Sequence, residues 1–203
     1  MDVTPEKQAN HPCEQNTSAI LDYLINNPYI KHIFLHAYWT GYIDKGLIVP
    51  TLGSSGENGQ GRYSNRNERV LSSFKKVIST LVGNGKSVYL IYPVPKMNVN
   101  PPLYLARKRL IWGERWKENA EVITLSYSEY LKQSENARKL LDAAADEFKV
   151  MKINLDSVLC SNGVDCIAND ADQIYYRDDN HLSVTGSFKV APMIAGYAFS
   201  KEE

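Results

Sequence analysis

Apolar positions along the chain follow two kinds of spacing. Five segments have the three- and four-residue spacing typical of amphipathic helices, namely residues 16–26, 70–81, 103–112, 127–148 and 183–199. Between them, three shorter runs centred on apolar residues are typical of buried strands, namely residues 31–37, 87–92 and 149–154. Because helices and buried strands alternate, we expect an α/β fold, a three-layer α/β/α sandwich with a mostly parallel sheet.

Local signals indicate where the predicted helices begin and end. Asn16 or Thr17 is a suitable N-cap for the first helix, and Ser183 is one for the last. The glycines of residues 83–85 are expected to stop the long second helix. Residues 44–62 are rich in Gly, Ser and Asn and are predicted to be a loop, whose serines do not follow a strand as a nucleophile turn requires.

Size and charge limit the classes of function. The chain has 203 residues, of which 43% are hydrophobic, so we expect residues 1–203 to form a single domain with its own core. Lys plus Arg and Asp plus Glu both total 23, which argues against nucleic-acid binding. No apolar run is long enough to span a bilayer, and residues 1–5 lack the regions of a signal peptide. No Cys/His cluster has zinc-site spacing, so neither a metal nor a cofactor is predicted.

The strongest candidate for catalysis is the stretch Y-Y-R-D-D-N-H-L-S at residues 175–183. Asp178 and His181 lie three positions apart in a short turn before the last helix. An aspartate beside a histidine holds the imidazole in one tautomer, so that the ring can take a proton from a serine hydroxyl and return it to a leaving group. The pattern leaves one alternative open: Asp178 caps the following helix and His181 is an uncoupled surface residue.

Aromatic residues follow the first predicted strand. Ligands of open parallel sheets bind beyond the carboxyl ends of the strands, so Trp39 and Tyr42 are candidate substrate-binding residues. Packing of these rings against a neighbouring loop is the alternative that the sequence leaves open.

These blocks together resemble the SGNH/GDSL hydrolase family. The resemblance is closest to the SGNH domain fused to the membrane-embedded acyltransferase-3 domain of bacterial cell-surface O-acyltransferases. Residues 176–186 match its block Y-x-D-D-x-H-L-S-x-x-G, and residues 85–95 resemble its G-K-x-V-Y-L-I-Y-P-V-P run. Trp39 and Tyr42 match its A-R-W-x-x-Y block, although Tyr38 replaces the arginine. The resemblance implies an SGNH hydrolase-like, flavodoxin-like fold.

The resemblance also implies a function. We expect transfer of an acyl group, most simply acetyl, to a hydroxyl of a cell-envelope glycan such as lipopolysaccharide or another surface polysaccharide. A serine acyl-enzyme would form, with His181 as base and Asp178 as its orienting residue. The implied partners are an acyl donor, the glycan acceptor and a membrane-embedded acyltransferase domain upstream, and the implied location is extracytoplasmic. An acetyl esterase and a non-catalytic glycan-binding module are the alternatives.

The sequence departs from the family pattern at the nucleophile and in its cysteines. It contains no G-D-S turn, so the first strand and the serine that follows it are expected to be missing, through truncation or through natural loss. Cys160 and Cys166 enclose five residues and can close a short loop, whereas three reduced thiols are the alternative. The resemblance favours a Cys160–Cys166 disulfide and an oxidising compartment. It also pairs Cys13 with a cysteine further upstream.

Overall fold

The computed structural model describes residues 12–43, 59–113 and 121–199. Its elements in chain order are α1 (Pro12–Asn26), β1 (His32–Leu35), α2 (Trp39–Ile43), α3 (Gly59–Gly83), β2 (Ser87–Ile91), α4 (Pro101–Trp112), β3 (Thr124–Ser126), α5 (Tyr127–Gln133), α6 (Glu135–Phe148), β4 (Met151–Ile153), α7 (Asp156–Leu159), β5 (Asp165–Ile167) and α8 (Val184–Phe199). None of the described helices is both long and apolar enough to cross a membrane.

The central sheet has three parallel strands in the order β1-β2-β4. In its register, Phe34 lies beside Tyr89, and Tyr89 lies beside Met151. The three strands are those that the apolar runs predict. Within the described part of the chain, β1 pairs only with β2 and is therefore an edge strand.

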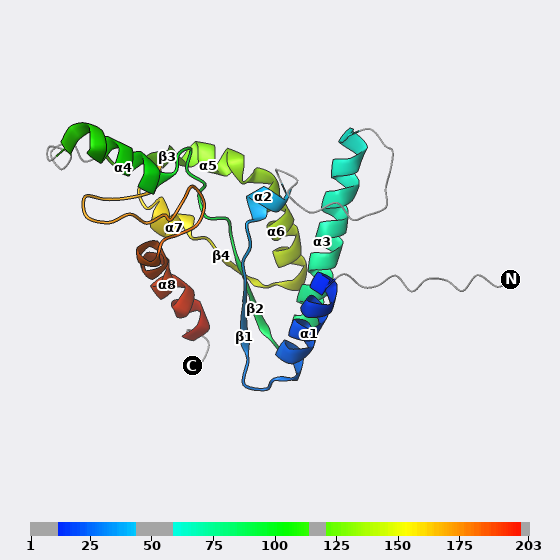
Figure 1. Cartoon of the computed structure of the whole chain (residues 1–203). Coiled ribbons are helices and arrows are strands. Elements are labelled where there is room, and N and C mark those ends of the chain that lie inside the picture. Colours follow the sequence, from blue (N-terminus) through cyan, green and yellow to red (C-terminus); the bar gives the residue numbers. More distant parts are fainter. Residues whose placement is uncertain (1–11, 44–58, 114–120, 200–203) are drawn as a thin grey trace.

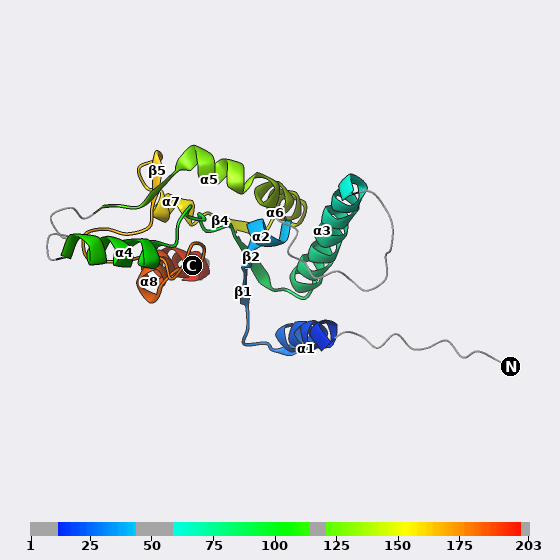
Figure 2. The same cartoon turned by 45° about the horizontal axis from the view of Figure 1, so that its top comes forward.

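Helices cover both faces of the central sheet. Figures 1 and 2 show α4 and α8 on one side of the sheet and α1, α3 and α6 on the other. Side chains of β2 alternate between the two faces: Val88 and Leu90 pack in the core under α3 and α6, and Tyr89 faces Tyr197 of α8 at a centroid distance of 6.5 Å. The predicted three-layer α/β/α fold is confirmed.

A second, two-stranded sheet lies close to residues 175–183, the stretch with the candidate catalytic pair. Strands β3 and β5 pair antiparallel, with Leu125 opposite Cys166. The sequence did not indicate these strands, because three residues are too few to show a period. The predicted disulfide between Cys160 and Cys166 is present and ties the end of α7 to β5. The expected partner of Cys13 concerns a side chain outside those that the structure describes.

The three largest differences from the predicted element boundaries all concern helices. Helix α1 begins at Pro12, so Asn16 and Thr17 lie inside it and the predicted cap is wrong. Helix α3 begins at Gly59, within the predicted loop, and the rest of that loop, residues 44–58, lies outside the described residues.

The third difference is a break in the predicted helix 127–148, which the structure divides into α5 and α6 at Ser134. The buried Ser134 hydroxyl donates to the carbonyl of Tyr130 at 2.8 Å, and the Ser134 amide donates to the same oxygen at 3.0 Å. A serine that bonds back to the preceding turn bends a helix, which explains the break.

Candidate active site

The candidate site is a turn between Tyr176 and Leu182, which form an antiparallel bridge. The amide of Arg177 donates to the carbonyl of His181 at 2.8 Å and closes the turn. Asp178 lies inside it, in the first position after Arg177. The turn therefore brings the aspartate back toward the histidine by local backbone geometry alone.

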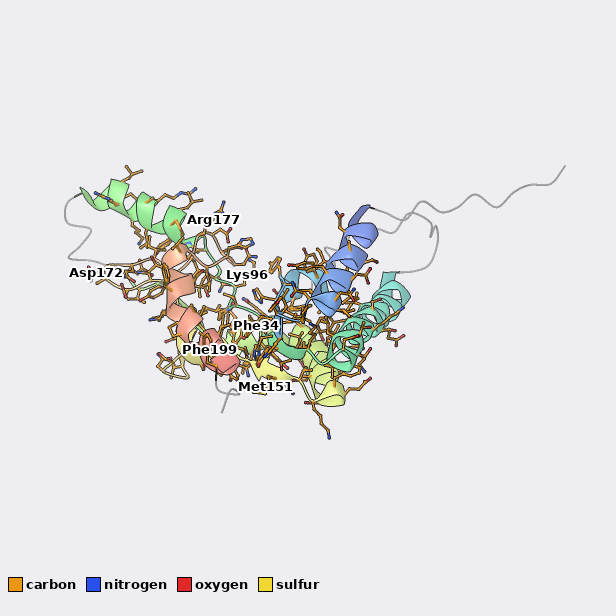
Figure 3. The ribbon with its side chains drawn as sticks, turned by 90° about the horizontal axis from the view of Figure 1, so that it is seen from below. Phe34, Lys96, Met151, Asp172, Arg177 and Phe199 are labelled. Carbon is orange, nitrogen blue, oxygen red and sulfur yellow. A yellow bond between two sulfur atoms is a disulfide. The ribbon has the colours of Figure 1, made fainter. Side chains whose placement is uncertain are left out.

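Contacts with the segment after β2 hold this turn in place. The Tyr176 hydroxyl is buried and donates to the carbonyl of Pro95 at 2.8 Å, and burial raises the pKa of this phenol, which stays a neutral donor. The amide of Met97 donates to the carbonyl of Asp179 at 2.8 Å, and Lys96 pairs with the Asp179 carboxylate at 2.5 Å. In Figure 3, Lys96 and Arg177 lie on the same side of the molecule as α4. The turn is thus anchored beyond the carboxyl end of β2.

Helix α8 begins directly after the turn. The Ser183 hydroxyl accepts a hydrogen bond from the amide of Gly186 at 3.0 Å, so the predicted N-cap is confirmed. The same hydroxyl donates to the carbonyl of Ile174 at 2.7 Å. A Cβ atom at Gly186 would come within 2.0 Å of the Tyr175 carbonyl oxygen, so only glycine allows this close approach. The start of α8 is therefore held against the strand-like segment that precedes the turn.

The Asp178 carboxylate uses its two oxygens for different partners. Oδ2 lies 2.8 Å from Nδ1 of His181, and Oδ1 accepts from the amides of Asn180 at 2.9 Å and His181 at 2.8 Å. The predicted hydrogen bond to the ring is present. The carboxylate also accepts from backbone amides, but these belong to the turn and not to helix α8, which Ser183 caps, so Asp178 is not the helix cap of the alternative. Partial burial acts to raise the pKa of Asp178, but these hydrogen bonds outweigh it and hold that pKa below its ordinary value.

This geometry leaves the other ring nitrogen of His181 accessible. Because an ionised carboxylate only accepts, Nδ1 carries a proton, and in the neutral ring Nε2 carries the lone pair. The His181 side chain is 66% exposed, and Nε2 has no hydrogen-bond partner among the described residues. Chemically, the pair can take a proton from a hydroxyl group at Nε2 and stabilise the resulting imidazolium through Asp178.

Trp39 and Tyr42 lie in α2, beyond the carboxyl end of β1, but their side chains have different environments. The Trp39 indole is buried, donates to the carbonyl of Ile91 at 3.0 Å and meets the Phe74 ring of α3 edge-on at 5.1 Å. Tyr42 is exposed and lies near Tyr38, with their ring centroids 6.5 Å apart. Trp39 is thus a packing residue, although it packs against α3 and the end of β2 and not against a loop, and of the two only Tyr42 presents its ring to solvent.

A groove of about 680 Å³ lies beside the turn. Arg177 and Leu182 line it from the turn, Pro102 lines it from α4, and α8 contributes Val184 and Phe188. Neither Trp39 nor Tyr42 lines this groove. Sequence reasoning missed Arg177 and Phe188, although Arg177 lies within the 175–183 block and Phe188 follows Val184 by one helical turn.

The described residues hold no group of three or more His, Cys, Asp or Glu side chains that could bind a metal ion. The model of one protein family, the SGNH domain fused to AT3 domains, matches residues 1–196. No curated protein is similar enough to the chain to count as a match.

Proposed function

The chain belongs to the family of SGNH domains that are fused to AT3 domains, and we propose that it acts in O-acyl transfer to a cell-envelope glycan, with His181 as the acid–base group. The main support for the proposal is the 2.8 Å hydrogen bond between Asp178 and Nδ1 of His181. This bond leaves the other ring nitrogen, Nε2, on an exposed side chain and accessible. Membership of this family supports a hydrolase-like acyltransferase module, and the acyl group is most simply acetyl.

Transfer proceeds in two half-reactions. In the first, Nε2 of His181 takes the proton of a serine hydroxyl while the serine oxygen bonds to the acyl carbon, and the imidazolium then protonates the leaving oxygen of the donor. In the second, Nε2 takes the proton of a glycan hydroxyl whose oxygen attacks the acyl-enzyme, and the serine oxygen recovers that proton. Asp178 stabilises the imidazolium in both.

The serine nucleophile is the part of this mechanism that the sequence lacks, because it contains no G-D-S turn. The proposal places the serine on a further strand that pairs with the open edge of β1. A parallel strand there would end at the same rim of the sheet as the segment that anchors the His181 turn, and ligands of such sheets bind at that rim. The AT3 domain would supply the acyl group from the membrane, with this chain on the extracytoplasmic side.

A second candidate is a glycan-binding module without catalysis, which the absence of a G-D-S turn favours. In that case His181 would contact a sugar hydroxyl without removing its proton. An acetyl esterase is the third, because water in place of the glycan hydroxyl would complete the same two half-reactions as hydrolysis.

The test is acetyl transfer by the full-length protein that contains this chain. The protein is incubated with an activated acetyl ester and glycan acceptors, and acetylated glycan and free acetate are both measured. General acid–base catalysis contributes about 100-fold or more, so we expect His181→Ala to lower the rate of glycan acetylation by at least that factor. Asp178→Asn should lower it as well, because a neutral amide stabilises the imidazolium less than a carboxylate does.

The matched control is His32→Ala, which removes a histidine at the start of β1, the strand end opposite the site. We expect it to retain the rate of the unchanged protein. Glycan acetylation that survives His181→Ala would remove the mechanism. Release of acetate without acetylated glycan would identify an esterase, and glycan binding with neither product would identify the binding module.

A further inference from the structure

Arg177 and His181 lie opposite each other in the turn. They follow Tyr176 and precede Leu182, the two residues of the antiparallel bridge, and the Arg177 amide donates to the His181 carbonyl at 2.8 Å. Opposite residues of an antiparallel pair project to the same face, with Cβ atoms about 5 Å apart. Successive side chains of a strand point to opposite faces. Accordingly, Tyr176 is buried, whereas Arg177 and His181 are both exposed. The guanidinium and the imidazole therefore leave the turn on the same side.

Among the described residues, each charged side chain of the turn has an ion-pair or hydrogen-bond partner except Arg177. The Asp178 carboxylate binds the His181 ring and two backbone amides, and the Asp179 carboxylate pairs with Lys96. The Arg177 guanidinium makes no ion pair or side-chain hydrogen bond with any residue that the structure describes. Both neighbouring carboxylates are thus already occupied, and Arg177 is the cation of this turn that is left to bind a ligand.

The groove beside Arg177 is otherwise mostly apolar. Phe188 of α8 borders it and its side chain is 74% exposed, together with Val184 of the same helix, which is 73% exposed. Large apolar side chains gathered in an exposed groove are typical of a binding surface. An aromatic ring of this kind can pack against the C–H face of a sugar ring, while a cation beside it binds an acidic substituent of the same sugar.

We propose that this groove binds an anionic sugar unit of the acceptor glycan, with Arg177 on its carboxylate or phosphate group and Phe188 under the ring. This inference rests on the proposed transferase function and names its acceptor class. A guanidinium binds either anion through two parallel hydrogen bonds. A neutral sugar or an acyl chain would leave that guanidinium without a partner. His181 does not line this groove, but Arg177 lies opposite it in the turn, so a sugar held by Arg177 lies next to the turn that carries Nε2.

The test is a binding measurement that needs no nucleophile. The 203-residue chain is titrated, by calorimetry or by NMR, with three oligosaccharides of equal length: one neutral, one with a uronic acid and one with a sugar phosphate. A charged hydrogen-bonded pair is worth about tenfold or more in affinity, so we expect both anionic probes to bind that much more tightly than the neutral one. The ratio between the two anionic probes shows which anion the groove prefers.

Variants assign the preference to particular side chains. Arg177→Gln should remove the preference for the anionic probes and leave the neutral probe unchanged, and Arg177→Lys should keep part of it because the charge remains without the planar fork. Phe188→Ala should weaken all three. The matched control is Arg107→Gln, which removes an exposed arginine of α4 that does not line the groove.

Equal affinity for neutral and anionic probes would overturn the inference, as would an equal loss in Arg107→Gln, which would indicate attraction by net charge alone. The outcome is separable from that of the transferase proposal. His181→Ala should retain the anionic preference and lose acetyl transfer. If Arg177→Gln removes the preference for anionic oligosaccharides in a protein that transfers no acetyl group, the groove is confirmed as an anionic-sugar site and the transferase proposal is wrong.

Discussion

Two regions of the molecule each contain a buried apolar cluster, but they differ in the contacts that fix their loops. The regular region comprises β1, β2 and β4 with α3 and α6, and its core consists of fully buried aliphatic side chains such as Ile78, Leu90 and Leu141. The turn region comprises β3, β5, α7 and residues 168–183. There, side chains bond to distant backbone: the Tyr176 hydroxyl to Pro95, and Asn169 Oδ1 to the amide of Ile123 at 2.8 Å.

The difference follows from the structural role of each region, which is packing of layers in one and positioning of a turn in the other. Apolar burial is non-directional, so it stabilises layers of regular elements without setting the exact position of any loop. A turn that holds Asp178 and His181 in register needs directional contacts, since its own residues are too polar and too exposed to form a core. The Cys160–Cys166 disulfide and the hydrogen bonds to distant backbone are such directional contacts.

The largest effect is expected in the regular region. Leu141→Ala removes a side chain that is 0% exposed under α3, and such changes cost about 2–5 kcal/mol of the free energy of unfolding because a cavity remains. Urea denaturation measures the loss. The control is Leu110→Ala, a leucine of α4 that is 85% exposed, which should change stability little. A similar loss in both variants would mean that apolar burial does not distinguish the two positions.

Removal of the disulfide should affect the turn region selectively. The bond closes a loop of seven residues, for which the chain-entropy relation gives about 2 kcal/mol. In the variant with Cys160→Ser and Cys166→Ser, we expect amide exchange to accelerate in β3 and β5 and to stay slow in β1 and β2. A reductant should have no further effect on this variant. Uniform acceleration in both sheets would show that the two regions unfold as one unit.

A smaller effect is expected from one hydroxyl group. Tyr176→Phe leaves the buried carbonyl of Pro95 without its 2.8 Å partner, which should cost about 1 kcal/mol. We also expect slower acyl transfer, because this bond sets the position of the turn relative to the segment after β2. Tyr29→Phe is the control, since that ring is 92% exposed. If Tyr176→Phe keeps full stability and full transfer, the hydroxyl does not position the turn.

The smallest effect concerns pH. The folded-state pKa of Asp178 lies below its ordinary value, so the ionised carboxylate stabilises the fold above the unfolded-state pKa of about 4 and loses this contribution as pH falls through the folded-state pKa. The difference in free energy of unfolding between the unchanged protein and Asp178→Ala should therefore be present at pH 5 and shrink below pH 4. A difference that grows as the solution is acidified would contradict the hydrogen-bonding role of the carboxylate.

The amino-acid sequence determined the elements whose signals are local or periodic. Apolar spacing was sufficient for the parallel strands and most of the helices, since burial on a regular element repeats every two or every three to four residues. Ser183 could be recognised as a cap because capping involves residues within one turn. The pairing of Asp178 with His181 and the Cys160–Cys166 bond also join residues close in the chain. Local separation made these features possible to predict, and the resemblance to the family favoured the pair and the disulfide over their alternatives.

Tertiary structure alone decided the features that depend on partners far along the chain. Strands of three residues, such as β3 and β5, carry no period and exist only because they pair with each other. Whether the Trp39 ring faces substrate or core depends on Ile91 and Phe74, which are distant in sequence. The place of Arg177 beside the groove likewise depends on α4 and α8 meeting there. Long-range packing energies settle such choices, and no window of adjacent residues contains them.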